Sequence, residues 1–184
     1  MTEPKIAPYG SWDSPITSDL IVSEVVGVSQ PTIDGDEIYW NEMRPSEGGR
    51  SVIIRRDSAG VTRDVTPQPF NARTRVHEYG GGDYVAQDGS VYFSNFADQR
   101  LYVQAGDAAP RPITPAGKMR YADAIIDSRR GRLICVREDH GDEKEAVNTL
   151  TSIKLDGAGE DGGEVIVSGN DFYSSPALSP GGST

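Results

Sequence analysis

The sequence predicts an all-β protein: a partial β-propeller of about three complete four-stranded blades and the start of a fourth. One observation is a recurring sequence pattern. In it, a small or apolar residue is followed by a tight turn that contains glycine, and then by a run of β-branched and aromatic residues. The turn glycines of its four copies are spaced 54, 42 and 50 residues apart: Gly35, Gly89, Gly131 and Gly181. Another is the content of 21 Gly and 12 Pro in 184 residues, which favours turns over helices. Internal periods of roughly 40–50 residues with several short strands per unit are typical of propellers.

Residues 1–19 are expected to form an extended N-terminal leader that lies on the surface of another part of a protein. Prolines at 4, 8 and 15 and a glycine at 10 disfavour regular structure there. Ser18 and Asp19 offer a cap for one short helical turn over 20–22. The remainder, 20–184, is expected to be the partial propeller domain.

The first blade is predicted at about 20–67. Its β-rich runs alternate with turn signals, and its strands are expected at 25–28, 38–40, 51–55 and 61–65. The connections are expected at the turn Pro31–Gly35, the Pro-Ser-Gly loop 45–49 and the tight turn 57–60. Asp34, like Asp88 and Asp156, precedes a glycine, which suits a tight turn because such turns need positive φ.

Two further blades follow the same pattern, at about 79–115 and 121–169. Their strands are expected at 83–86, 91–94, 101–104 and 111–113, and then at 122–126, 133–137, 149–155 and 165–167. The next blade is expected to start at 174–184, where the chain reaches Thr184 within a Ser-Pro-Gly-Gly turn. A four-stranded sheet buries its faces by stacking on its neighbours. We therefore expect a fragment of a larger propeller whose open blade faces favour self-association.

Charge and cysteine content exclude several functional classes. The net charge of −10 argues against a nucleic-acid partner, which requires clustered Lys and Arg. Cys135 is the only cysteine, so no internal disulfide is expected; it lies in an apolar run, which indicates a buried, inert thiol. No Cys/His pattern suggests a metal, and no motif suggests a cofactor. The N-terminus lacks a signal-peptide pattern and no run of 18 apolar residues occurs, so a cytoplasmic protein without a membrane partner is expected.

Four stretches, in this order, resemble the propeller domain of the prolyl oligopeptidase family of serine peptidases. The similarity is greatest to the bacterial dipeptidyl-aminopeptidase/acylaminoacyl-peptidase-like branch. The stretches are 7–16 (APYGSWDSPI), 75–82 (RVHEYGGG), 120–123 with 136–140 (RYAD, VREDH), and 169–182 (GNDFYSSPALSPGG). The leader, the His-Glu-Tyr-Gly-Gly-Gly string and the Arg-Glu-Asp-His string are the specific parts.

The resemblance implies a two-domain serine peptidase acting on short peptides. In such proteins an α/β-hydrolase domain carries the Ser, Asp and His of catalysis, and the propeller gates access to them. This chain has no Gly-x-Ser-x-Gly nucleophile elbow and no hydrolase domain, so we assign it no catalytic residues. The missing hydrolase domain and a short peptide are its expected partners. The alternative is a stand-alone β-propeller interaction module without enzymatic activity.

Arg137 and Glu138 are the candidate substrate-binding residues, because they end a predicted strand before a polar insertion. A propeller carboxylate can hold a peptide N-terminus, and an arginine can hold a carbonyl or carboxylate. The competing interpretation is a salt bridge within the blade. His77 and Glu78 are expected to be structural, since neighbours on a strand point to opposite faces. The glycines at 80–82 precede a strand rather than a helix, which disfavours a phosphate-binding loop.

Overall fold

The computed structural model describes residues 6–22, 25–141, 145–157 and 162–181, and these form an almost purely β structure. The predicted all-β class is confirmed. The described residues contain one short helix, α1 (Ser18–Val22), and one 3-10 turn, Pro45–Glu47. All strands belong to three sheets of four antiparallel strands each, and each sheet runs in simple chain order.

The three sheets are up-and-down meanders. Sheet 1 contains β1 (Gly27–Asp34), β2 (Glu37–Arg44), β3 (Arg50–Arg56) and β4 (Thr62–Asp64). Sheet 2 contains β5 (Tyr84–Gln87), β6 (Ser90–Ser94), β7 (Leu101–Ala105) and β8 (Arg111–Pro112). Sheet 3 contains β9 (Met119–Asp127), β10 (Arg132–Asp139), β11 (Val147–Lys154) and β12 (Glu164–Val167).

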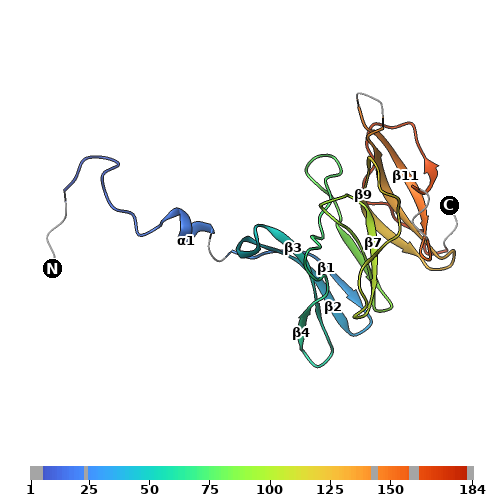
Figure 1. Ribbon diagram of the computed structural model, residues 1–184, viewed down its shortest axis with the longest axis horizontal. Coiled ribbons are helices and arrows are strands. Elements are labelled where there is room, and N and C mark those ends of the chain that lie inside the picture. The colour runs from blue at the N-terminus through green and yellow to red at the C-terminus, as the bar shows by residue number, and fades with distance from the viewer. Residues whose placement is uncertain (1–5, 23–24, 142–144, 158–161, 182–184) are drawn as a thin grey trace.

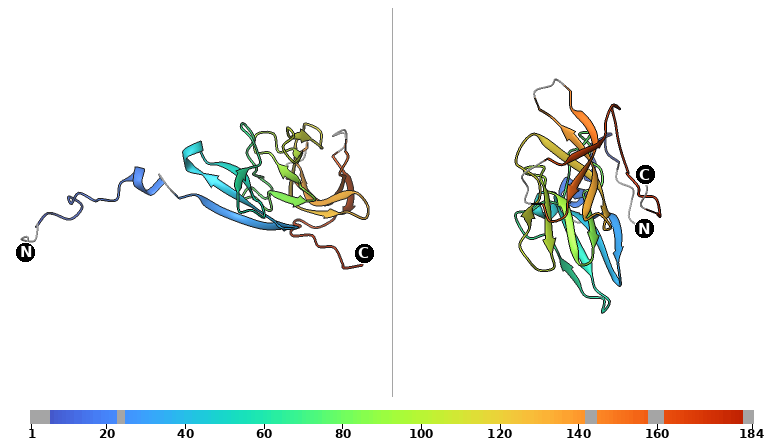
Figure 2. Two further views of the ribbon diagram at one scale, coloured as in Figure 1. Left: turned by 90° about the horizontal axis from the view of Figure 1, so that it is seen from below. Right: turned by 90° about the vertical axis from the view of Figure 1, so that its right-hand side faces the viewer.

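The sheets stand side by side in chain order and meet along their first strands, as Figures 1 and 2 show. Strand β5 contacts β1 on one side and β9 on the other. The meander topology places two kinds of connection at the same end of the sheets: the segments between sheets and the loops between second and third strands. We call this the connecting end. The opposite, hairpin end carries the tight turns between first and second strands.

The hydrophobic core lies between neighbouring sheets, because side chains alternate along each strand. On β6, Val91 and Phe93 belong to the cluster shared with sheet 1, whereas Tyr92 belongs to the cluster shared with sheet 3. On β10, Leu133 and Cys135 face sheet 2, and Val136 packs in a third cluster on the other side. Sheet 2 thus buries both of its faces against its neighbours, and sheets 1 and 3 each bury the face that adjoins sheet 2.

Strand β1 corrects one predicted turn. The sequence places a turn at Pro31–Gly35, but β1 runs through Pro31 to Asp34 and the turn follows. A bulge between Ser29 and Thr32 contains Gln30, whose φ is 54°, and Pro31. Proline lacks an amide donor and is tolerated where a ladder hydrogen bond is already interrupted. The bulge accommodates Pro31 without ending the strand.

The predicted cap of the short helix is displaced by one residue. The Thr17 hydroxyl, rather than Ser18 or Asp19, accepts the backbone N–H of Leu20 at 3.1 Å. Residues 6–22 extend away from the three sheets (Figures 1 and 2). Their Ile6, Tyr9 and Trp12 side chains are exposed. Residues 1–5 of the predicted leader and 182–184 of the predicted fourth blade lie outside the described residues.

Polar contacts join successive turns at the hairpin end. The Asp34 carboxylate accepts the backbone N–H groups of Asp88, at 3.0 Å, and of Gly89, at 2.8 Å. The Gln87 amide in turn donates to the Ser128 hydroxyl at 2.6 Å. Asp34 therefore serves the next sheet as well as its own turn. Its position four residues before the predicted strand 38–40 did not indicate that second role.

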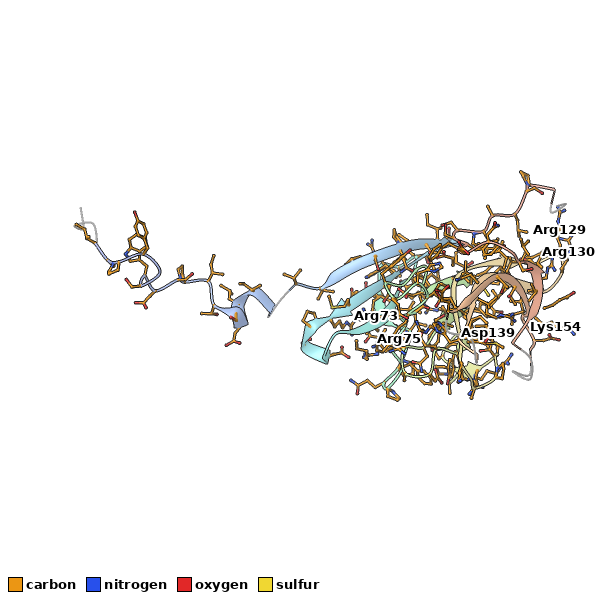
Figure 3. All side chains as sticks on the ribbon, turned by 90° about the horizontal axis from the view of Figure 1, so that it is seen from above. Arg73, Arg75, Arg129, Arg130, Asp139 and Lys154 are labelled. Atoms are coloured by element: carbon orange, nitrogen blue, oxygen red, sulfur yellow. The ribbon has the colours of Figure 1, made fainter. Side chains whose placement is uncertain are left out.

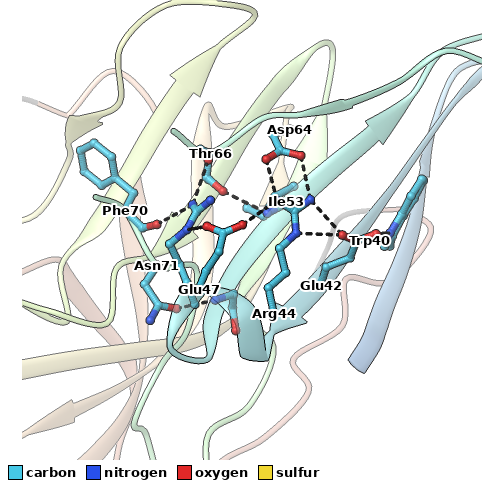
Figure 4. A network of polar contacts seen from close by, with 11 residues as sticks. Trp40, Glu42, Arg44, Glu47, Ile53, Asp64, Thr66, Phe70 and Asn71 are labelled. Carbon is cyan, nitrogen blue, oxygen red and sulfur yellow. Dashed lines mark hydrogen bonds and ion pairs between the residues drawn. The ribbon is translucent and has the colours of Figure 1, made fainter. Parts of the chain in front are cut away.

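An ion-pair network joins the loop between β2 and β3 to strands β2 and β4 of sheet 1 (Figure 4). The Arg44 guanidinium contacts Asp64 at 2.7 Å, Glu42 at 2.9 Å and Glu47 at 3.0 Å. The hydrogen bond with Asp64, opposed by burial, raises the pKa of Arg44. Arg50 donates to the carbonyl groups of Thr66 and Phe70 and so fixes the chain as it leaves sheet 1. This network is structural and ties β2, β3 and β4 to the loop between β2 and β3.

No helix in the described part of the chain is long and apolar enough to cross a membrane.

Candidate functional site

Polar and charged groups gather at the connecting end, between sheets 2 and 3. A pocket of about 430 Å³ lies there, and we call it the connecting-end pocket. It is formed by Arg75 in the segment before β5, by the loop between β6 and β7, by residues 116–120 around the start of β9, and by the residue after β10. Its charged lining residues are Arg75, Asp98, Lys118, Arg120 and His140. The volume is in the range of small-ligand sites, which makes this the candidate functional site.

Glu138 is buried next to this pocket and accepts contacts from three sides. Its Oε1 accepts the backbone N–H of His77 at 2.7 Å, and its Oε2 lies 3.0 Å from Nε2 of His140. Nη1 of Arg120 lies 3.8 Å from Oε2. Only 5% of the Glu138 side chain is exposed. The carboxylate therefore organises its surroundings, and His140 is the member of this group that lines the pocket.

His77 connects Glu138 to the segment that follows sheet 3. Its Nε2 lies 3.1 Å from the carbonyl oxygen of Tyr173. Its Nδ1 lies 3.2 Å from Oε1 of Glu138, but not in line for a hydrogen bond. Both ring nitrogens therefore face oxygen atoms, and the ring lies between Glu138 and the segment that follows sheet 3.

The expected geometry of His77 and Glu78 needs correction. These residues lie in a turn rather than on a strand, with φ values of 56° and 64°. His77 turns inward, whereas the Glu78 carboxylate is exposed and accepts from Arg120 at 2.6 Å. That hydrogen bond lowers the pKa of Glu78. The two side chains hold different parts of the connecting end, which agrees with the structural role expected for them.

Arg137 points away from Glu138, as expected for neighbours on a strand. Its Nη1 donates to the carbonyl groups of Gly162 and Gly163, at 3.2 Å each. The residue is buried, and its Nε has no hydrogen-bond partner among the described residues. The structure therefore does not bring Arg137 and Glu138 to one ligand position. Glu138 belongs to the connecting-end pocket through His140, and Arg137 belongs to the turn before β12.

The glycine string is explained by close packing against Asp123. A Cβ on Gly82 would lie 2.9 Å from Oδ1 of Asp123 and 3.2 Å from its Cα. Asp123 has a φ of 54°, and its carboxylate accepts the N–H groups of Gly82 and Ser175. It thus joins the segment that enters sheet 2 to the segment that leaves sheet 3. The glycines allow this approach and do not surround a ligand position.

Sequence reasoning missed most of the pocket. Arg75 and Arg120 belong to stretches that resemble the family but carry no site signal of their own, and Lys118 carries no sequence signal. These residues lie up to 65 positions apart from His140 along the chain, and only sheet packing brings them together. Among the described residues, no group of three or more His, Cys, Asp or Glu side chains is arranged to hold a metal ion.

Comparison with known proteins identifies solved structures that match the chain. A puromycin-hydrolyzing peptidase of Mycobacterium tuberculosis is 36% identical, with a TM-score of 0.84, over 96% of this chain and 29% of its own length. Puromycin hydrolase is 33% identical, with a TM-score of 0.85, over 96% and 30%. A serine-to-alanine mutant of puromycin hydrolase in complex with PGG is 34% identical, with a TM-score of 0.75, over 85% and 26%. The chain thus spans less than a third of the length of these proteins.

No protein-family model and no curated protein matches the chain.

Proposed function

Because this chain belongs to the prolyl oligopeptidase family of serine peptidases, as an N-terminal portion, we propose that it is the non-catalytic part of an enzyme that hydrolyses short peptides. The observation that carries the proposal is identity of 33% or more over 96% of the chain with two solved peptide- or puromycin-hydrolysing proteins. Catalysis would reside in an α/β-hydrolase domain, the proposed partner of the chain.

Sheets 1, 2 and 3 would be consecutive blades of a propeller, with the boundaries 20–67, 79–115 and 121–169 and the next blade beginning at 174. The side-by-side meanders, which meet along β1, β5 and β9, support this arrangement. In the described residues the sheets do not close into a ring, and 174–181 form no strand. The outer faces of sheets 1 and 3 would pack on further blades or, in the isolated chain, on another copy.

The propeller would gate access of short peptides to the hydrolase domain. We place the substrate-facing surface at the connecting end, because the buried polar group of Glu138 and the connecting-end pocket lie there. Glu138 would contribute to substrate binding by orienting His140. A direct contact from Arg137 would require its hydrogen bonds to Gly162 and Gly163 to break. The exposed Tyr9 and Trp12 of the leader would pack on the hydrolase domain.

The test compares this chain with the product of the complete reading frame that encodes it. Both are incubated with short peptide p-nitroanilides and assayed for release of p-nitroaniline. We expect hydrolysis by the complete product and none by the 184-residue chain. A Glu138→Gln variant of the complete product should show a raised KM, and Glu164→Gln, on the exposed strand β12, should not.

Two results would contradict the proposal. One is a complete product that lacks a Gly-x-Ser-x-Gly segment and hydrolyses no peptide; that outcome favours the stand-alone interaction module. The other is hydrolysis by the 184-residue chain itself, since it contains no nucleophile elbow.

A further inference from the structure

We propose that the connecting-end pocket binds a carboxylate group of a peptide, through the guanidinium of Arg75. This inference deepens the proposed function and rests on it, because it assigns part of the substrate to a position on this chain. It is supported by the position of Arg75 in the lining of the pocket, by the hydrogen bonds of its backbone and by the charge of the groups around it.

Arg75 is held in place by its backbone. Its N–H donates to the side chain of Gln99 at 2.7 Å, and its carbonyl accepts from Nη1 of Arg120 at 2.8 Å. Its guanidinium carbon lies 5.6 Å from the ring centroid of Phe96, within the range of a cation–π contact. The charged group is thus positioned beside the pocket before any ligand binds, which lowers the entropy cost of binding.

The guanidinium of Arg75 has no carboxylate partner within the described part of the chain. This is notable in a protein with 28 acidic and 18 basic residues, where acidic partners are abundant. Arg73 shares the ring of Phe96, at 5.1 Å, and likewise pairs with no described carboxylate. Figure 3 labels both arginines near each other. Only Arg75 lines the pocket.

The acidic groups near the pocket are already engaged. Oδ1 of Asp98 accepts from Asn95 at 2.9 Å, and its Oδ2 accepts from the hydroxyl of Tyr102 at 2.6 Å. Burial and the hydrogen bond to Asp98 raise the pKa of Tyr102 to about 12, so the Tyr102 hydroxyl remains a donor at neutral pH. Glu138 contacts His77, His140 and Arg120, and Glu78 contacts Arg120. None of these carboxylates forms an ion pair with Arg75, although the charge of Arg75 adds to that of Arg120 in lowering the pKa of Glu78.

Two further cationic groups, those of Lys118 and Arg120, line the pocket. Arg120 also contacts Glu138, with Nη1 at 3.8 Å from Oε2. The ammonium of Lys118 donates to the carbonyl of Gly141 at 3.0 Å, at the same rim. A planar carboxylate matches the two-pronged geometry of a guanidinium. In a peptide it can come from the C-terminus or from an Asp or Glu side chain.

The test measures equilibrium binding to the 184-residue chain by calorimetry at low ionic strength. The probes are a tripeptide with a free C-terminus, its C-terminal amide, and an amidated tripeptide that contains Glu. Both carboxylate peptides, or one of them, should bind about tenfold more tightly than the neutral amide. The peptide that binds identifies the source of the carboxylate. Raising the salt concentration should reduce the difference.

Arg75→Gln and Arg73→Gln form a matched pair, because each removes one charge from the ring of Phe96. Arg75→Gln should abolish the preference for the carboxylate peptide, and Arg73→Gln should preserve it. Circular dichroism of both variants establishes that they fold. The proposal is overturned if amide and carboxylate bind equally, if no peptide binds, or if Arg73→Gln removes the preference as fully as Arg75→Gln. Peptidase activity is judged separately by the hydrolysis assay, so equal binding of the amide would leave the proposed function standing.

Discussion

Replacing Glu138 by glutamine should destabilise the chain substantially. The substitution preserves the size of a side chain that is 5% exposed, so no cavity forms and the effect reports the carboxylate. An oxygen of glutamine can still accept the N–H of His77, now 2.7 Å from Oε1. The new amide nitrogen, however, would face Nε2 of His140 and Nη1 of Arg120, where Oε2 now lies at 3.0 and 3.8 Å.

The magnitude follows from these contacts. Removing one partner of a buried charged group typically costs about 3–5 kcal/mol, because the opposite charge loses its compensation. Since one hydrogen bond survives, we expect a loss near the lower end, about 3 kcal/mol. For a denaturant dependence of roughly 2 kcal/mol per molar urea, the unfolding midpoint should fall by about 1.5 M. The melting temperature should fall by about 6–12 °C for a chain of this size.

The assay is urea unfolding at pH 7, followed by tryptophan fluorescence and by circular dichroism at equal protein concentrations. Glu164→Gln is the control, because it removes the same charge from an exposed position on β12. It should change the free energy of unfolding by less than about 0.5 kcal/mol. A loss below that same value for Glu138→Gln would refute the reasoning, since the carboxylate would then not stabilise the His77, His140 and Arg120 groups around it.

Two further predictions concern a buried thiol and a buried carboxylate that is paired with two partly exposed arginines. Burial raises the pKa of Cys135 to about 12, so the native chain should not react with a disulfide reagent at pH 8. In guanidinium, which unfolds the chain, one thiol should react. Rapid reaction of the native chain would contradict the burial of this thiol. Burial opposes ionisation of Asp127, but Arg132, 3.0 Å away, and Arg130 outweigh it and hold the pKa of this carboxyl below its usual range. A lowered folded pKa stabilises the chain above the unfolded value of about 3.9, and this contribution is lost as the pH falls through the folded value. Arg132→Gln should therefore destabilise the chain at pH 6 and have little effect at pH 2.5 in thermal unfolding; equal losses at both values would exclude the ion pair as the cause.

The sequence by itself determined the all-β class and the positions of most strands. Continuous runs of β-branched and aromatic residues, as in 91–93, favour a buried strand, and turns such as Asp88-Gly89 depend on local backbone sterics. Both are properties of neighbouring residues and can be read without knowing the tertiary structure. Even so, the turn predicted at Pro31 is not formed, and a bulge accommodates this proline within β1. Pairing of β1 with β2 outweighs the local preference of proline for a turn.

Only the tertiary structure decided the candidate site. Glu138 was predicted as a candidate from its place at the end of a strand, but its partner His77 lies 61 residues away in sequence. Arg75 carries no local signal that separates it from Arg73, since both are exposed arginines over the same ring. The packing of sheets 2 and 3 distinguishes the two arginines, because it places Arg75 and not Arg73 at the connecting-end pocket. Contacts of this kind depend on the positions of whole sheets, and no pattern of adjacent residues encodes them.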